Sequence, residues 1–161
     1  MPSAPRETEW FDRPDPTGRT RTGEVGLRFS CTQCGNCCSG LPGFVGFTPE
    51  EGKAIARELG VSEEEFLERY TRDTHEGRSI KDLRPEGSNS WDCVFLTREN
   101  GRTGCSIYDV RPAQCRTWPF WRSNLRSRDH WQRAAEGCPG INTGELRSPG
   151  TVRLTRERVD I

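Results

Sequence analysis

Four of the eight cysteines of this chain lie within eight residues, in the run Cys31-Thr32-Gln33-Cys34-Gly35-Asn36-Cys37-Cys38. The C-x2-C-x2-C-C spacing returns three thiols to one side of a tight loop and places the fourth next to the third. Thiolates held this close repel one another unless a cation lies between them. The run therefore predicts a site for a soft metal ion or an iron–sulfur cluster.

The other four cysteines are spread over the second half of the chain, and we treat all eight as candidate metal ligands: Cys31, Cys34, Cys37, Cys38, Cys93, Cys105, Cys115 and Cys138. Eight thiols can be divided into two tetrathiolate sites. Neighbouring side chains tend to point in different directions, so one of Cys37 and Cys38 can bind the first centre while the other faces a second centre or a nearby thiol. We expect Cys31, Cys34 and Cys37 to share a site, and the assignment of the other five is open.

Zinc and an iron–sulfur cluster are the two candidate occupants. Zinc takes four thiolates tetrahedrally and can bring about 10–16 kcal/mol of binding energy into folding. A four-iron [4Fe-4S] cluster is the competitor, because the ferredoxin run C-x2-C-x2-C is followed by Cys-Pro, and this chain has that run with a distant Cys138-Pro139. We lean to the iron–sulfur centre. A disulfide framework is the least favoured reading in a reducing compartment.

A tetrathiolate around zinc, or around an oxidised four-iron cluster, carries a formal charge of −2. Four arginines lie close in sequence to cysteines and are candidates to offset that charge, namely Arg28, Arg111, Arg116 and Arg122. The alternative for any one of them is an ordinary surface position. The vicinal pair of Cys37 and Cys38 adds a candidate thiol-redox element.

Two helices are predicted where capping signals precede helix-forming residues. Thr48-Pro49-Glu50-Glu51 is a capping box with proline at the first helical position, and Gly60 ends that helix. Ser62-Glu63-Glu64-Glu65 is a second capping box. Because three consecutive glutamates would repel the phosphates of a nucleic acid, we interpret the pair as scaffold rather than as a DNA reader.

Shorter elements are expected around the cysteines. A strand over 24–30 would deliver Cys31, residues 73–90 are expected to form an irregular loop, and Asn100-Gly101 is a hairpin signal between β-like runs at 91–96 and 105–108. The remaining expectations are a short helix that starts near Pro112 and stops at Pro119, a polar helix over 122–136, and a turn at 138–140.

These elements combine into a small, irregular α+β fold, nucleated by its metal-binding cysteines, with a helix pair and a short β-hairpin. Only 31% of residues are hydrophobic and 30% are charged, so the core needs help from cross-linking. We expect a flexible N-terminal arm over 1–22, the zinc/iron-chelating cysteine-cluster domain over 23–142, and a polar C-terminal tail over 143–161.

The charge balance and the absence of apolar segments limit the partners. The 24 basic and 24 acidic residues cancel, so we expect neither nucleic acid nor a membrane surface as a partner. No targeting segment or membrane span is visible, which makes the cytoplasm the expected location. The partner, a protein or a redox partner, and the oligomeric state are not readable from the sequence.

Four motifs follow one another along the chain: Phe29-x-Cys31-x2-Cys34-Gly35-x-Cys37-Cys38, Asp92-Cys93-x-Phe95-Leu96, Cys105-x-Ile107-Tyr108-x2-Arg111-Pro112-x2-Cys115-Arg116 and Cys138-Pro139-Gly140. This ordered series resembles the YkgJ-like cysteine-cluster family, also called CxxCxxCC, over roughly residues 27–141. All eight cysteines have counterparts in this pattern. The resemblance implies chelation of zinc or iron. Some members carry the label iron–sulfur oxidoreductase, and a related module occurs in flagellin lysine methylases, an activity that would need more chain than this.

The function expected from these observations is chelation of zinc or iron through the eight cysteines, with an iron–sulfur centre in electron transfer or in redox or iron sensing. A zinc-stabilised structural or interaction module without catalysis is the first alternative. An iron–sulfur oxidoreductase component is the second, although no catalytic constellation of acids, bases or nucleophiles is apparent and we name no catalytic residue.

Overall fold

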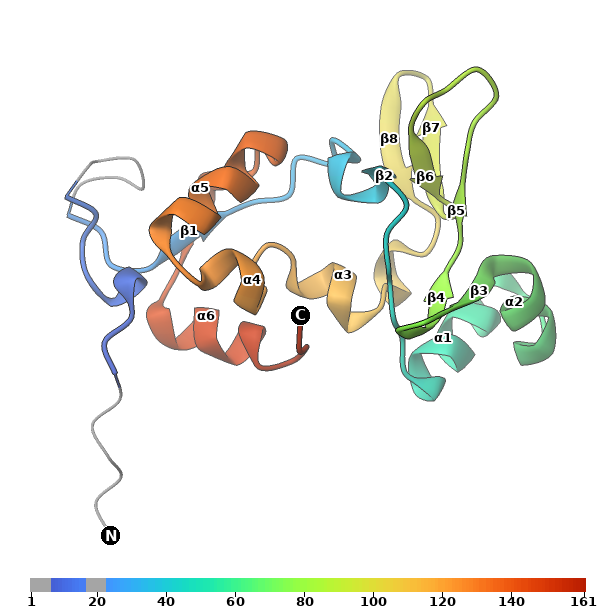
Figure 1. The fold of residues 1–161 in the computed structure, drawn as a ribbon, viewed down its shortest axis with the longest axis horizontal. Helices are drawn as coiled ribbons and strands as arrows, with labels where there is room; N and C mark the ends of the chain where they lie inside the picture. The colour runs from blue at the N-terminus through green and yellow to red at the C-terminus, as the bar shows by residue number, and fades with distance from the viewer. Residues whose placement is uncertain (1–6, 17–22) are drawn as a thin grey trace, which may run out of the picture. The chain divides into compact units, whose positions relative to one another are not determined.

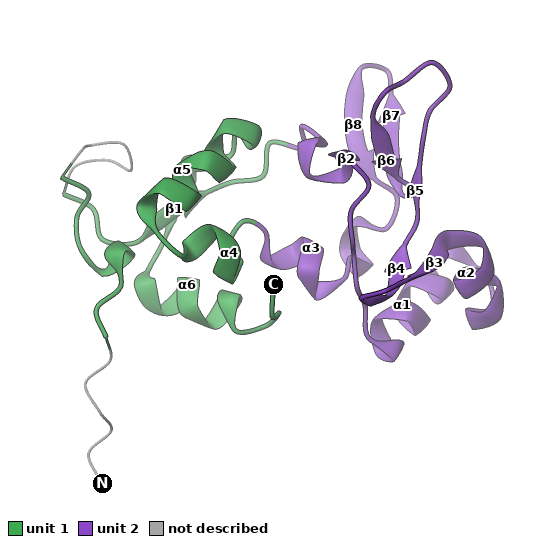
Figure 2. Ribbon diagram, in the orientation of Figure 1, with its two compact units in different colours: residues 1–32, 119–161 green, residues 33–118 purple. Residues whose placement is uncertain are grey.

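The computed structural model describes residues 7–16 and 23–161 and divides them into two units (Figures 1 and 2). Unit 1 is built from residues up to Thr32 and from Pro119–Ile161, and unit 2 is the continuous segment Gln33–Trp118. The division into segments 1–22, 23–142 and 143–161 expected from the sequence stays a prediction. Residues 1–6 and 17–22 of the expected N-terminal arm lie outside the described residues.

The helix pair of unit 2 forms where the capping signals predicted it. In α1 (Pro49–Leu59) the Thr48 hydroxyl accepts from the Glu51 backbone N–H, and the Glu51 carboxylate accepts from the N–H of Thr48. Gly60 then ends the helix in the left-handed conformation that glycine adopts without strain. In α2 (Glu63–Tyr70) the Ser62 hydroxyl accepts from the Glu65 N–H. Both helices are confirmed.

An aromatic core joins this helix pair to the strands that carry the cysteines. The ring of Tyr70 on α2 stacks on Phe95 with centroids 5.5 Å apart, and Phe66 packs against Tyr70 at 6.3 Å. Ile55 of α1 and Ile107 belong to the same buried cluster. Apolar burial of this kind is worth roughly 1.5–3 kcal/mol per large side chain, and it fixes the cysteine-bearing strands to the helices.

Unit 2 contains three small antiparallel sheets. One has the strand order β2 (Ser39–Gly40), β6 (Trp91–Cys93), β5 (Asp82–Leu83). The second is the hairpin of β3 (Thr71–Thr74) and β4 (Gly77–Ile80), and the third pairs β7 (Leu96–Glu99) with β8 (Arg102–Cys105). The Asn100-Gly101 hairpin is confirmed: both residues have positive φ, as a tight turn between twisted strands requires.

Two local expectations for unit 2 are wrong. The expected loop over 73–90 contains β4 and β5, whose polar strands lack the apolar alternation by which strands are recognised. They are held instead by cross-strand contacts such as the ion pair of Arg78 with Asp73. The β-like run at 105–108 ends as a strand at Cys105 and continues into the 3-10 turn η3 (Tyr108–Val110). The short helix α3 (Ala113–Thr117) starts after Pro112, as predicted.

Unit 1 brings together the two ends of the described chain. Strand β1 (Leu27–Phe29) pairs with β9 (Ile141–Arg147), and the 3-10 turn η1 (Trp10–Asp12) inserts Phe11 into a core that includes Trp131 and Val152. The Glu9 carboxylate accepts from Arg153 Nε at 2.8 Å and also pairs with Arg156. Helix α6 (Pro149–Arg156) and the end of β9 therefore give regular structure to the segment expected to be a polar tail.

The polar helix expected over 122–136 is divided in two, α4 (Arg122–Leu125) and α5 (Arg128–Gly137). The division falls at Ser127, whose hydroxyl accepts from the His130 backbone N–H and so caps α5. The fold as a whole is the small, irregular α+β arrangement that the sequence predicted. None of the helices within residues 7–16 and 23–161 combines the length and apolar character needed to cross a lipid bilayer.

Candidate metal centre

None of the eight cysteines forms a disulfide, and the two units share them unequally. Unit 2 holds Cys34, Cys37, Cys38, Cys93, Cys105 and Cys115, whereas unit 1 holds Cys31 and Cys138. The thiols that act on one another electrostatically within unit 2 come from distant parts of the chain. We call this set the thiol cluster, and it consists of Cys37, Cys38, Cys93, Cys105 and Cys115.

A left-handed glycine shapes the loop that delivers Cys37 and Cys38. Gly35 has φ +78 and precedes the 3-10 turn η2 (Asn36–Cys38), in which the Cys38 N–H donates to the Gly35 carbonyl at 2.9 Å. A Cβ at Gly35 would lie 2.4 Å from Cγ2 of Thr103, so the loop packs tightly against the strand that ends in Cys105. Glycine is needed here both for the backbone conformation and for the close approach.

Sheet register brings the cysteine loop beside Cys93. Strand β2 pairs Ser39 with Asp92 and Gly40 with Trp91, so the antiparallel register continues from Cys38 towards Cys93. Asp92 is itself buried and pairs with Arg98 of β7. The pairing therefore brings Cys93, which lies 55 positions after Cys38 in the sequence, next to the cysteine run.

Backbone N–H groups are directed at two of the sulfur atoms. The N–H of Phe95 hydrogen-bonds the Cys93 sulfur, and the N–H of Ile107 hydrogen-bonds the Cys105 sulfur, in two turns of the same i to i+2 form. Hydrogen bonds to sulfur stabilise its thiolate form and tune a metal bound to it. Both turns are also tied into the core, because Phe95 and Ile107 are buried.

Two side-chain contacts position Cys115. The carboxylate of Glu51, on α1, accepts from the Ala113 N–H at 2.7 Å, at the start of the helix that carries Cys115. The amide of Gln114 clamps the chain before α1, accepting from the Gly46 N–H at 3.0 Å and donating to the Phe44 carbonyl at 2.7 Å. Helix α3 is thereby fixed to the segment that follows the cysteine run.

Cys37 and Cys38 form a coupled pair with their sulfur atoms 3.5 Å apart. The hydrogen bond from Cys38, the backbone N–H of Cys37 and the charge of Arg111 together lower the pKa of the Cys37 thiol to about 6, against the opposing effect of burial. The same sulfur–sulfur hydrogen bond, with burial, raises the pKa of Cys38. At neutral pH the pair therefore carries one proton and one negative charge.

The other thiols of the cluster hold their protons more firmly. Burial, with the negative charge of neighbouring thiols, raises the pKa of Cys93 to about 11 and that of Cys115 to about 12. Burial also raises the pKa of Cys105. A bound cation would favour the loss of protons from these thiols, because its positive charge offsets the repulsion between the thiolates and the cost of burying them.

The thiol cluster supplies donor atoms but does not form a complete coordination shell. In the part of the chain that the structure describes, no three Cys, His, Asp or Glu side chains surround one point in metal-binding geometry. The donor chemistry nevertheless fits a soft metal, because the cluster combines five thiols, which come from η2, β6, β8 and α3.

Of the three cysteines expected to share a site, Cys37 belongs to the thiol cluster, and the expectation that Cys31 and Cys34 share its site stays a prediction. All three residues are exposed, with Cys34 on the loop before η2 and Cys31 in unit 1. Also in unit 1, Cys138 packs against the core, and the Ser30 N–H donates to the Gly140 carbonyl at 3.2 Å near both cysteines. The run's spacing alone did not indicate this grouping, which depends on the pairing of strands.

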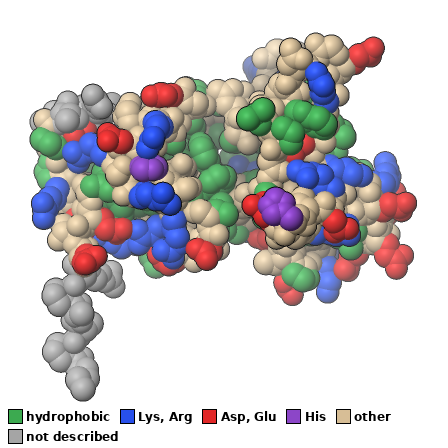
Figure 3. Space-filling view, in the orientation of Figure 1, with side chains coloured by type: hydrophobic (Ala, Val, Ile, Leu, Met, Phe, Trp, Pro, Cys, Tyr) green, Lys and Arg blue, Asp and Glu red, His purple; other side chains and the backbone are tan. Residues whose placement is uncertain are grey.

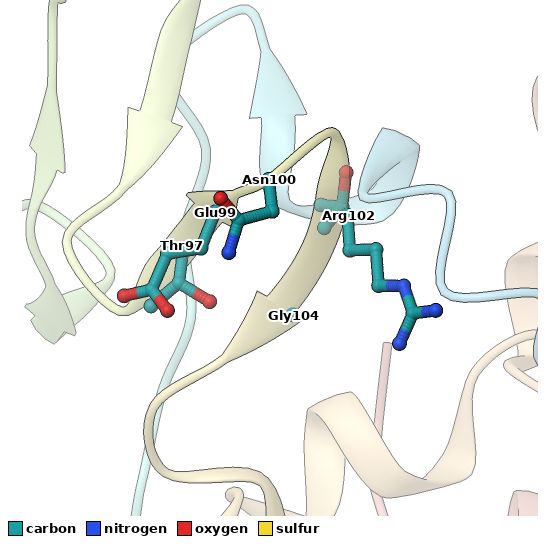
Figure 4. Close-up of a pocket in the computed structure, with 6 residues that line it drawn as sticks. Thr97, Glu99, Asn100, Arg102 and Gly104 are labelled. Atoms are coloured by element: carbon teal, nitrogen blue, oxygen red, sulfur yellow. The ribbon is translucent and has the colours of Figure 1, made fainter.

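A shallow hollow of about 450 Å³ lies on the β7–β8 hairpin and contains no thiol (Figure 4). Its lining is Thr97, Glu99, Asn100, Arg102, Thr103 and Gly104, with Arg102 extending away from Glu99 and Asn100. Such an open, polar hollow lacks the apolar walls of a small-molecule site. On the face shown in Figure 3, basic and acidic side chains are mixed on both units, in keeping with the net charge of zero.

Comparisons with known proteins agree with the chemistry of the cluster. Residues 30–139 match the family model CxxCxxCC, described as "Putative zinc- or iron-chelating domain". An uncharacterised protein of Methanocaldococcus jannaschii, MJ0661, is 32% identical over 95 residues, which are 59% of this chain and 46% of that protein. The chain thus spans about half the length of that relative. No solved structure matches.

Proposed function

Because this chain belongs to the CxxCxxCC family, we propose that its thiol cluster is a zinc or iron centre in which Cys37, Cys93, Cys105 and Cys115 are the ligands. The observation that carries this proposal is that each of the last three thiols feels the charge of Cys37. Cys38, next to Cys37, is the alternative ligand from the same turn. The prediction that the remaining cysteines also bind metal stays a prediction.

The elements around the cluster have defined roles in this proposal. The turns after β6 and β8 present backbone N–H groups to two sulfur atoms, which lowers the cost of carrying thiolates there. The Glu51 and Gln114 contacts hold Cys115 in reach of the other three donors. When bound, zinc would supply structural cross-linking, and an iron–sulfur cluster would supply one-electron redox chemistry.

For the occupant we propose an iron–sulfur centre that transfers electrons or senses redox state or iron. The support at the thiol cluster is its all-cysteine donor set, which an iron–sulfur cluster accepts as zinc does. The C-x2-C-x2-C run with Cys138-Pro139 also parallels ferredoxin sequences, although of its cysteines only Cys37 is in the proposed ligand set. A zinc-stabilised interaction module is the competing function, supported by the thin hydrophobic supply of the chain. For either one we propose a reducing, cytoplasmic location, in keeping with eight cysteines that form no disulfide.

The test is to measure metal and acid-labile sulfide in protein purified without oxygen, together with its visible spectrum. Iron and sulfide in near-equal amounts establish a cluster, and zinc without sulfide establishes the structural module. Cys93→Ser and Cys115→Ser should then each lose the metal of the thiol cluster. If both variants keep the metal content of the wild type, the four-ligand assignment is wrong.

A further inference from the structure

Cys37 and Cys38 are neighbours in the sequence, and their sulfur atoms also lie close in space, 3.5 Å apart. In an extended strand the side chains of consecutive residues point to opposite faces. The two cysteines lie instead in the 3-10 turn η2, where about three residues per turn separate consecutive side chains by only about 120°. The turn therefore allows the two sulfur atoms to approach each other.

The turn is anchored on both sides, so the backbone keeps the two thiols together. The Cys38 N–H and the Ser39 hydroxyl both donate to the Gly35 carbonyl, at 2.9 and 3.1 Å. Before the turn Gly35 packs against Thr103, and after it Ser39 pairs with Asp92 in the β2–β6 ladder. Two groups that are already held in proximity lose little further entropy when they react with each other.

The pair is accessible from solution, and a bond between its sulfur atoms would be reversible. Cys37 is exposed and Cys38 is half-buried, so a dissolved reagent meets Cys37 first and Cys38 is placed to react second. Adjacent Cα atoms are about 3.8 Å apart, which is less than the roughly 4.4–6.8 Å spanned by ordinary disulfides. A disulfide between adjacent residues is therefore easily reduced, which suits a switch rather than a permanent cross-link.

We propose that Cys37 and Cys38 are a redox switch, which forms a reversible disulfide and thereby dismantles the metal centre. The oxidant is a low-molecular-weight disulfide of the glutathione class. The effect on the metal rests on the proposed function, in which η2 supplies one ligand, Cys37 or its alternative Cys38. Because the disulfide consumes both sulfur atoms, the three other ligands are left without a fourth protein donor.

The reaction is an ordinary thiol–disulfide exchange in two steps. The Cys37 sulfur attacks one sulfur of glutathione disulfide, which forms a mixed disulfide and releases one glutathione. The Cys38 sulfur then attacks the Cys37 sulfur, which closes the protein disulfide and releases the second glutathione. The protein loses two electrons, glutathione disulfide gains them, and the two thiol protons pass to the glutathione thiolates. In the metal-loaded protein the departing metal ion replaces the proton of Cys37, and one glutathione takes its proton from water.

The first part of the test uses the full-length, metal-free protein, treated without oxygen with one equivalent of oxidised glutathione. The remaining free thiols are alkylated and located by mass spectrometry. We expect Cys37 and Cys38 to escape alkylation, without bound glutathione, and dithiothreitol to restore both thiols. Cys38→Ser should stop at the mixed disulfide and keep one glutathione on Cys37. Cys34→Ser is the matched variant, because Cys34 is an exposed thiol of the same loop, and it should react as the wild type does.

Three outcomes of this part would overturn the inference. They are a wild-type disulfide that joins Cys37 to any cysteine other than Cys38, a glutathione adduct that persists on the wild type, and a block of the reaction in Cys34→Ser. If Cys38→Ser does not fold, the location of the wild-type disulfide decides.

The second part repeats the oxidation on zinc-loaded protein and follows zinc release with a zinc indicator. Loss of a group that merely supports a ligand weakens metal binding by about 10–100-fold, so loss of the ligand itself should weaken zinc binding by more than about a hundredfold. Reduction should restore the affinity. Protein that keeps its zinc after oxidation would overturn the switch. Reduced protein that binds no zinc would overturn the proposed function, and the metal-free reaction would still show separately whether the thiol pair forms a disulfide.

Discussion

Glu51 connects the helix pair to the helix that carries Cys115, and replacing it should affect stability and metal binding together. Its carboxylate accepts from the N–H of Thr48 at 2.9 Å and from the N–H of Ala113 at 2.7 Å, and only 18% of the side chain is exposed. Glu51→Ala removes half of a capping box and leaves the Ala113 N–H without its acceptor.

The magnitude follows from these two hydrogen bonds. Loss of a capping interaction costs about 1 kcal/mol, and a half-buried N–H deprived of a charged acceptor costs about 1.5–3 kcal/mol. We expect Glu51→Ala to lower the free energy of unfolding by about 2–4 kcal/mol. Glu51→Gln keeps an acceptor oxygen but not the charge, so its loss should be about half as large.

Urea unfolding of the metal-loaded protein, followed by circular dichroism, measures the stability, and Co²⁺ titration measures the affinity. Glu50→Ala is the control, because Glu50 is an exposed residue in the same helical turn. The metal affinity of Glu51→Ala should fall as well, since Cys115 is less firmly positioned. If Glu51→Ala unfolds at the same urea concentration as Glu50→Ala, the reasoning about the α1–α3 contact is refuted.

Two further predictions follow from the thiol cluster and its loop. At pH 7.5, zinc binding should release about three protons, because Cys37, with its pKa lowered to about 6, is already ionised, while the other three proposed ligands have raised pKa values and must lose their protons. The zinc affinity should therefore increase with pH until those three thiols are ionised without the metal. Release of one proton or fewer in a pH-indicator titration would contradict the ligand set. Gly35→Ala should destabilise the protein by about 1–3 kcal/mol more than Gly87→Ala. Both positions have positive φ, but only a Cβ at position 35 would collide with the Thr103 side chain. Equal unfolding midpoints of the two variants would show that the loop does not pack as described.

Local signals in the sequence were sufficient for elements that are stabilised locally. The helices after Thr48 and Ser62 depend on hydrogen bonds between residues three positions apart, and the Asn100-Gly101 turn depends on backbone conformation alone. The β3–β4 hairpin was missed because its strands are polar and gain their stability from pairing. Helix α6 was missed because a single residue, Val152, supplies its fully buried contact with the core of unit 1.

The sequence predicts which residue type binds the metal, and the grouping of the eight cysteines stays a prediction. Thiol chemistry and spacing indicate a metal site from the cysteine run alone. The spacing also predicts a site shared by Cys31, Cys34 and Cys37, because spacing reflects only how close residues are along the chain. The structure groups Cys37 with Cys93 and Cys115, which depends on strand register and on the Glu51 contact with α3. Such long-range pairing leaves no local signature in the sequence.

The discontinuity of unit 1 has a consequence for the order of events during synthesis. Unit 2 is one uninterrupted segment, so the ribosome has polymerised every thiol of the cluster before it reaches Pro119. Strand β1 is translated before unit 2, whereas its partner β9 and the arginines that bind Glu9 are translated after it. The nascent chain thus presents a complete set of cluster thiols while the N-terminal segment still awaits the strand and helix that bury it.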